Sequence, residues 1–293
     1  MKKFFIALAA FLNLAVCPFI CAQSGEIRIT GSDIIGEKII PELKRDFDAL
    51  GVKVSIDMHG SRDAILDLSQ KRSDIAIAAF LDGDTLPKDK VCVPYAHQIA
   101  VIIVNSGNPI EEISFDQLSR VFGSTGEKIE KWQAFGLNNE VALRNISPMA
   151  VQPRENVTLE LFKAKVLGGA NIAAAFGNNL SSADIVKSVS NTVNAIAIVS
   201  SVPSNKSVKA LGVSASLMNP QYFKPTPENV HNGDYPLTMH FYLVYNKEDA
   251  KKLRPVIQEL FSDAIADKLA EGNFVPAPKN FRKSYTLGLD IDK

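Results

Sequence analysis

The sequence contains few cysteines, and their positions argue against a disulfide. Cys17 and Cys21 fall within the first 22 residues, which leaves Cys92 alone in the rest of the chain. A single cysteine cannot form an intramolecular disulfide, so packing must stabilise the folded state. Cys92 stands between Val91 and Val93, a setting that favours a buried thiol over a reactive one.

Motifs that would indicate an enzyme or a metal site are also absent from the sequence. There is no Gly-x-Ser-x-Gly elbow, no phosphate loop of the Walker type and no dinucleotide fingerprint. The histidines are His59, His97, His231 and His240. No pair of them has the i, i+4 spacing of a helical zinc motif. We therefore expect a protein that is not an enzyme and that uses no cofactor and no metal.

Neither sign of charge is in excess. The 32 lysines and arginines equal the 32 aspartates and glutamates, and losing Lys2 and Lys3 with an N-terminal signal leaves 30 against 32, a net charge of −2. This balance gives no electrostatic reason to expect nucleic acid or an anionic membrane as a partner. The sequence also shows no internal repeat and no low-complexity tract.

The first 22 residues have the three-part form of a secretory signal peptide. Lys2 and Lys3 precede an apolar run from Phe4 to Val16, and small residues follow up to Ala22. The mature protein is predicted to begin near Gln23. About 270 residues then remain, enough for one large or two medium hydrophobic cores.

Two other interpretations of the N-terminus are weaker. Asn13 interrupts the apolar run and no basic stop-transfer cluster follows it, which argues against a permanent membrane anchor. A lipoprotein is the second alternative, because Cys17 and Cys21 lie in the right zone. However, Val16 and Ile20 precede these cysteines where a small residue is expected.

Strand and helix signals alternate along the mature chain, the pattern of an α/β fold with a mainly parallel sheet. Apolar residues recur every fourth position from 35 to 47 and predict a helix that ends at Gly51. The apolar run 99–104 predicts a buried central strand. It ends in a cluster of turn residues at 105–109, where we place the first crossing between two lobes.

Further helices are predicted along the rest of the chain. One covers 62–70, another starts at Ser114 as its N-cap, and two more start near Asn156 and Ser182. A long final helix is predicted over about 247–269, with its first turns disturbed by Pro255.

The order of these segments resembles the phosphate-binding, PstS-like members of the type II periplasmic binding protein superfamily. Ile29-Thr30-Gly31-Ser32 and His59-Gly60-Ser61 resemble the family's strand-to-helix loops that carry Gly-Ser. The most specific similarity is Gln98 to Pro109 with the family's "IAVVVNxxNP" segment, and the single tryptophan, Trp132, falls where the family has one. Weaker similarities are Lys71–Ala79, Ser114–Phe122, Thr158–Gly169 and Asp234–Leu237.

The resemblance implies two α/β lobes, each a mostly parallel sheet flanked by helices, with a ligand cleft between them. Lobe I is expected to comprise 23–104 plus 236–293, and lobe II 105–235. The implied function is that of a periplasmic receptor that closes on phosphate or a related small oxyanion and delivers it to ABC permease subunits. Members of this class usually act as monomers, and we expect one here.

The resemblance also implies a ligand site at the N-termini of helices. Oxyanions suit these termini because unpaired backbone N–H groups and the positive end of the helix dipole meet there. The candidate ligand-binding residues are Ser32, Asp33, Ser61, Arg62, Arg154, Asn156 and Thr158. The alternative is that the hydroxyls of Ser32, Ser61 and Thr158 only cap helices, and that Asp33 bonds its own helix N-terminus.

Several departures from the family pattern leave the ligand open. The family's aspartate, which accepts a proton from monohydrogen phosphate, is missing near Ala79. The family loop "R-x-x-x-S-G-T" is shortened to Arg154–Thr158 and lacks its serine and glycine, while Asp33 and Glu155 add negative charge. A sensor or accessory protein of the cell envelope that no longer transports is therefore a second hypothesis. A hydrolase of phosphate esters is a third, although no nucleophile–base pair supports it.

Overall fold

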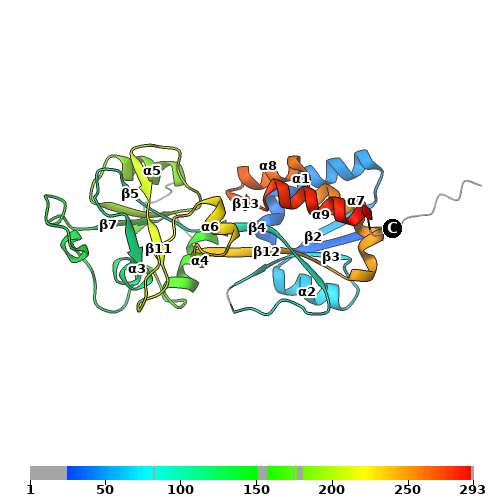
Figure 1. Cartoon of the computed structure of the whole chain (residues 1–293), viewed down its shortest axis with the longest axis horizontal. Helices are drawn as coiled ribbons and strands as arrows, with labels where there is room; N and C mark the ends of the chain where they lie inside the picture. Colours follow the sequence, from blue (N-terminus) through cyan, green and yellow to red (C-terminus); the bar gives the residue numbers. More distant parts are fainter. Residues whose placement is uncertain (1–24, 82, 151–156, 174, 177–180, 292–293) are drawn as a thin grey trace, which may run out of the picture.

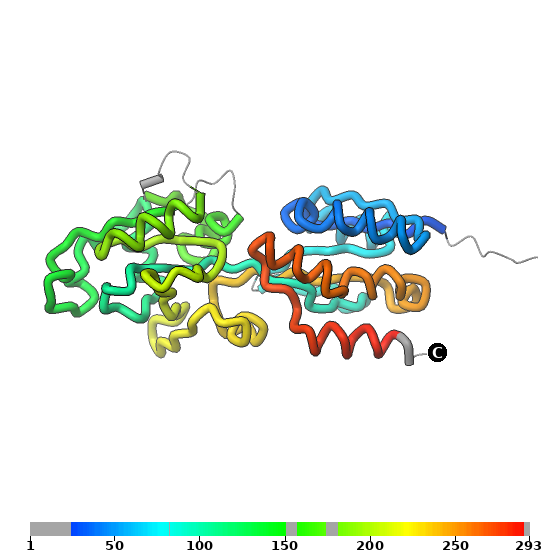
Figure 2. The backbone as a smooth tube through the Cα atoms, turned by 90° about the horizontal axis from the view of Figure 1, so that it is seen from above, coloured from blue at the N-terminus to red at the C-terminus, as the bar shows by residue number. Residues whose placement is uncertain are grey.

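The chain forms two lobes that lie end to end along its long axis (Figure 1). This computed structural model describes residues 25–81, 83–150, 157–173, 175–176 and 181–291. The predicted signal peptide, residues 1–22, lies outside the described residues. Figure 2 shows the same two lobes from above, with the C-terminal helix along one side of lobe I.

Lobe I contains a six-stranded sheet in the order β13-β4-β12-β3-β1-β2. Its strands are β1 (Ile27–Gly31), β2 (Val54–Met58), β3 (Ile75–Phe80), β4 (Val91–Ile99), β12 (Thr238–Tyr245) and β13 (Phe274–Pro276). β1 is parallel to both β2 and β3, whereas β12, β4 and β13 are added antiparallel. The sheet is therefore mixed rather than mostly parallel, because neighbouring β4 and β12 carry the chain in opposite directions between the lobes.

Helices cover both faces of this sheet. They are α1 (Asp33–Leu50), α2 (Ser61–Ser69), α7 (Ala250–Leu260), α8 (Asp263–Glu271) and α9 (Lys279–Ile291), with a 3₁₀ turn at Lys247–Asp249. In Figure 1, α2 lies below the sheet and α1, α8 and α9 lie above it. As predicted, α1 buries its apolar stripe and Gly51 ends it in the left-handed conformation.

The predicted long final helix is divided in the structure. α7 ends at Leu260, and α8 starts after Ser262, whose hydroxyl accepts a hydrogen bond from the Ile265 N–H at 3.2 Å. Arg282 of α9 donates to the carbonyls of Phe261 and Ser262 at 2.8 and 3.0 Å. Carbonyls at the end of α7 thus have a partner outside the helix, which allows the chain to turn there.

Lobe II contains a five-stranded sheet in the order β10-β5-β9-β7-β8. The strands are β5 (Val101–Asn105), β7 (Ser147–Ala150), β8 (Ala175–Phe176), β9 (Ala195–Val199) and β10 (Val208–Ala210), and β6 (Glu112–Ser114) pairs separately with β11 (Gly212–Ser214). The helices are α3 (Phe115–Phe122), α4 (Val157–Val166), α5 (Ser182–Ser190) and α6 (Pro227–His231), with a 3₁₀ turn at Trp132–Phe135. This sheet is also mixed, because β5 is antiparallel to both of its neighbours.

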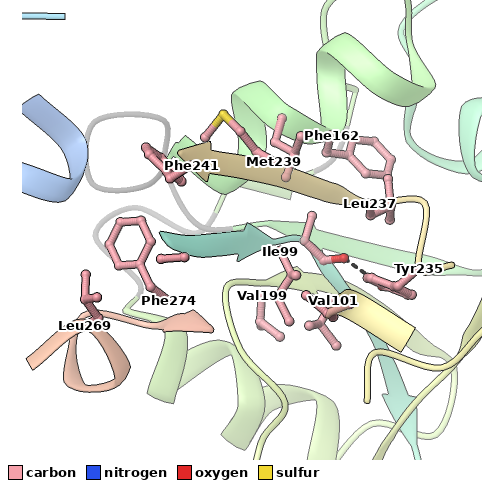
Figure 3. Close-up of a cluster of buried hydrophobic side chains, with 14 of the residues drawn as sticks. Ile99, Val101, Phe162, Val199, Tyr235, Leu237, Met239, Phe241, Leu269 and Phe274 are labelled. Carbon is pink, nitrogen blue, oxygen red and sulfur yellow. Dashed lines mark hydrogen bonds between the residues drawn. The ribbon is translucent and has the colours of Figure 1, made fainter. Parts of the chain in front are cut away.

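The chain passes from one sheet to the other at Ala100. β4 of lobe I ends at Ile99 and β5 of lobe II begins at Val101, so the first crossing precedes the turn cluster 105–109. The Ala100 N–H donates to the Leu237 carbonyl at 2.9 Å, and the buried Tyr235 hydroxyl donates to the Ala100 carbonyl at 2.7 Å. Figure 3 shows the apolar side chains packed around this point. We call Ile99–Val101 and Tyr235–Leu237 the hinge.

Candidate functional site

Two Gly-Ser loops lie side by side at the carboxyl end of the parallel strands. The Gly60 N–H donates to the Gly31 carbonyl at 2.9 Å, and the Ser32 N–H donates to the Ile77 carbonyl of β3 at 2.8 Å. A Cβ atom on Gly31 would lie 2.7 Å from the Met58 sulfur and 2.8 Å from the Ile77 oxygen, so the loops approach closely only because this residue is glycine. α1 and α2 therefore begin next to each other.

Ser32 and Ser61 have different surroundings within this arrangement. Ser32 is buried at the start of α1, and its hydroxyl makes no capping hydrogen bond to the helix. Ser61 is the first residue of α2, and its hydroxyl accepts a hydrogen bond from the Ala79 N–H of β3 at 2.8 Å. Neither hydroxyl caps its helix, and each keeps its own proton for donation to another acceptor.

Asp33 and Arg62 lie at the surface, next to the two serines in sequence. Asp33 is the first residue of α1 and is exposed, and Arg62 is the second residue of α2 and is also exposed. Asp63 adds a further acidic residue to the first turn of α2. These carboxylates favour the helix N-termini but oppose a bound anion, whereas Arg62 favours it.

β3 itself carries no carboxylate, in agreement with the sequence. β3 ends Ala78-Ala79-Phe80, and the Phe80 ring packs edge-on against Tyr242 of β12 with ring centroids 5.6 Å apart. A single sequence does not reveal this aromatic pair, because its two members come from strands far apart in the chain. It places an apolar surface beside the Ser61 loop.

The lobe II candidate within the described residues is Thr158, which is buried in the first turn of α4. α4 contacts β4, and Figure 1 shows it on the side of lobe II that faces lobe I. Arg154 and Asn156, the other candidates from this lobe, lie outside the described residues. Their part in the site therefore stays a prediction.

The described residues show neither a cluster of metal ligands nor a helix suited to cross a membrane. Among them, no group of three or more histidine, cysteine, aspartate or glutamate side chains is arranged to hold a metal ion. None of the described helices combines the length and the apolar character needed to cross a bilayer.

Comparison with known proteins supplies further findings. The family model described as "PBP superfamily domain" matches residues 22–264. The phosphate-binding protein PstS of Pseudomonas aeruginosa is 25% identical over 279 residues, covering 87% of this chain and 84% of that protein.

Solved structures give a similar result for the fold. A possible phosphate binding protein from Planctomyces limnophilus superposes with a TM-score of 0.68 at 17% identity, covering 91% of this chain and 98% of that one. PstS from Borrelia burgdorferi superposes with a TM-score of 0.67 at 18% identity, covering 86% and 98%. The two-lobed α/β fold predicted from the sequence is confirmed.

Proposed function

The chain belongs to the PBP superfamily domain family, as its motifs predict, and on that basis we propose that it is the solute-binding protein of an ABC importer. Its ligand is phosphate or a related small oxyanion, held in a cleft that closes when the lobes approach each other. The protein does not act as an enzyme, is exported to the periplasm through residues 1–22, works as a monomer and passes its ligand to permease subunits.

The observation that carries this proposal is the pair of hydrogen-bonded Gly-Ser loops. They bring the N-termini of α1 and α2 together at one edge of the sheet, with the Ser32 and Ser61 hydroxyls beside them. Backbone N–H groups, two helix dipoles and two hydroxyls form a surface suited to an anion. Thr158 and, from the sequence, Arg154 and Asn156 complete the proposed site from lobe II.

The two strands that join the lobes support the mode of binding. A ligand that contacts both lobes favours the conformation in which both contacts form, and binding is then coupled to closure. The relatives described above are named as phosphate-binding proteins, which supports an oxyanion as the ligand class.

The experiment uses purified mature protein that has been unfolded and refolded to remove any carried ligand. Its Tm is measured with phosphate, sulfate, arsenate, molybdate and small organic phosphates. A ligand that binds only the native state at a hundredfold excess over its Kd stabilises it by about 2.7 kcal/mol. We expect phosphate or a related oxyanion to raise the Tm.

Variants identify the site in the same experiment. Ser61→Ala is expected to abolish most of the ligand-induced rise in Tm. Ser69→Ala is the matched control, because Ser69 lies at the other end of α2 and its hydroxyl bonds the Ile65 carbonyl at 2.8 Å. A rise that survives Ser61→Ala unchanged would place the ligand elsewhere.

The strand end at Ala79 supports a second candidate function. Because β3 itself carries no carboxylate to accept the proton of monohydrogen phosphate, an envelope sensor or accessory protein that no longer transports is the second candidate. If none of the anions raises the Tm, this second function is the one to pursue.

A further inference from the structure

Three histidines that are distant in sequence meet beside the hinge. His97 lies on β4, His240 lies opposite it on β12, and His231 is the last residue of α6. The Nδ1 atoms of His97 and His240 are 3.0 Å apart. The His97 ring centroid lies 5.0 Å from that of His240 and 5.2 Å from that of His231. We call these three residues the histidine cluster.

The cluster is an unfavourable place for a positive charge. His97 is 5% exposed, and burial, followed by the charges of His240 and His231, lowers its pKa from the usual 6.5 to about 3. Burial also lowers the pKa of His231, whose buried Nδ1 has no hydrogen-bond partner. The short contact between two Nδ1 atoms needs one donor and one acceptor, so protonating both rings would set two N–H groups against each other.

The described strand residues that pair with His97 on β13 and with His240 on β3 carry no charge. The register partner of His97 on β13 is Val275, and that of His240 on β3 is Phe80. On β4, the neighbouring Gln98 is an uncharged amide. On the adjacent helices, Glu228 of α6 is exposed, and Glu160 of α4 is exposed and pairs with Lys163 at 3.1 Å. The charges that act on His97 are those of the other two imidazoles.

The position of the cluster couples it to the lobes. β4 and β12 belong to the sheet of lobe I, and His97 precedes the hinge by two residues. α6 lies on the segment that returns from lobe II and contacts β4, and Figure 1 shows it between the lobes. A change in the angle between the lobes therefore moves His231 relative to His97 and His240.

We propose that the histidine cluster is a pH-sensitive contact that holds α6 against β4 and β12 while its imidazoles are neutral and releases it when they are protonated. Only the consequence of this inference rests on the proposed function: if the lobes close on a ligand, ligand binding depends on pH. A conformation that buries the cluster binds fewer protons than one that exposes it. The cluster's contribution to the stability of the buried conformation is complete above pH 6.5 and is lost as the pH falls towards 3.

The test uses the ligand-free mature protein in the presence of a chelator, so its outcome does not depend on anion binding. The Tm and the radius of gyration from X-ray scattering are measured from about pH 8 to about pH 4. We expect both to shift as the pH falls. His231→Gln and His240→Gln should each remove about half or more of the shift in Tm.

The fourth histidine supplies the matched control. His59 lies outside the cluster, where its ring nitrogens approach Asp57 and Asp67 at 3.4 and 3.1 Å. His59→Gln is expected to keep the shift. A wild-type protein without the shift, or cluster variants that keep it in full, would overturn the proposal. In a separate measurement without the chelator, a rise in Tm with added Zn²⁺ that the cluster variants lose would also overturn it, in favour of a metal site.

If the variants do not fold at about pH 8, the wild-type protein still decides the question. Histidine ring signals are followed by NMR through the same titration, together with the scattering. We expect the His97 signal to report a neutral ring until the shape of the molecule changes. A His97 ring that gains its proton near its usual pKa with no change in shape would overturn the proposal.

Discussion

The two ends of the parallel strands β1, β2 and β3 are built from different chemistry. At the amino end, buried Asp74 accepts from the Arg28 side chain at 3.1 Å and from Lys252 of α7 at 2.9 Å. At the carboxyl end, two Gly-Ser loops are tied by backbone hydrogen bonds, and Asp33 and Arg62 are exposed. One end uses its charges within the fold, whereas the other presents helix N-termini and hydroxyls.

This difference indicates which end of the strands contributes to stability and which end binds the ligand. Charges that are buried and paired add to the free energy of unfolding only while both partners remain, and losing one partner leaves the other unpaired. At the carboxyl end, the Ser32 hydroxyl makes no capping bond and the Ser61 hydroxyl keeps its proton for donation, so both are available to a ligand. Substitutions of the paired charges at the amino end should therefore change stability alone, and substitutions of the serine hydroxyls at the carboxyl end should change binding.

Gly31→Val has the largest expected effect, because it inserts a branched side chain where the two loops meet. Its Cβ would lie 2.7 Å from the Met58 sulfur and 2.8 Å from the Ile77 oxygen. We expect the free energy of unfolding to fall by about 3 kcal/mol, measured by urea denaturation. Gly25→Val is the control, because no atom lies within 4 Å of a Cβ there. Equal stability of the two variants would show that the loops do not need a glycine at residue 31.

Asp74→Asn tests the amino end and should cost about 2 kcal/mol. Burial alone would raise the pKa of this carboxyl, but hydrogen bonds from Arg28 and Lys252 outweigh it and hold the pKa below its usual value. The stabilisation is therefore present above the usual pKa and is lost as the pH falls through the lowered one. Urea denaturation at several acidic pH values should show this loss in the wild type and a weaker one in the variant.

Asp89→Asn is the control for that comparison, because Asp89 is exposed and pairs with the adjacent Lys90. Its effect should stay within about 0.5 kcal/mol. If Asp74→Asn also removes the ligand-induced rise in Tm without changing the fold, the assignment of stability to the amino end and of binding to the carboxyl end is wrong.

Local sequence signals predicted the features that span only a few residues better than they predicted the rest. The Gly-Ser loops, the helix that ends at Gly51 and the cap at Ser114 each depend on residues within a few positions, and each forms as predicted. Ser114 accepts from the Gln117 N–H at 3.2 Å, and the Gln117 side chain accepts from the Ser114 N–H at 2.9 Å. Such a capping box is visible in sequence because it spans four residues.

Features that depend on distant residues were not predicted. The apolar run 99–104 gives no indication that it changes sheets at Ala100, because both of its parts are equally buried. The division of the final helix depends on Arg282, which reaches Phe261 and Ser262 from another helix. The histidine cluster joins residues 143 positions apart, a contact that a single sequence does not reveal.

Tyr235→Phe tests whether the hinge belongs with the stabilising end or with the binding end. The substitution removes the hydroxyl that bonds the Ala100 carbonyl at 2.7 Å and leaves that carbonyl without this donor. We expect a loss of about 1 kcal/mol in urea denaturation. Tyr222→Phe, at a half-exposed position, is the control. A change in the ligand-induced Tm shift larger than the change in stability would assign the hinge to binding.

Ser32→Ala has the smallest expected effect on stability and separates a capping role from a binding role. A capping serine replaced by alanine costs about 1 kcal/mol. Because the Ser32 hydroxyl makes no capping bond to α1, its loss should cost less than about 0.5 kcal/mol in the ligand-free protein. Ser114→Ala is the positive control, since its hydroxyl does cap α3. In the presence of phosphate the order should reverse, with Ser32→Ala losing the rise in Tm and Ser114→Ala keeping it. A Ser32→Ala protein that loses about 1 kcal/mol but keeps the rise would make Ser32 part of the scaffold, and the carboxyl end would then resemble the amino end.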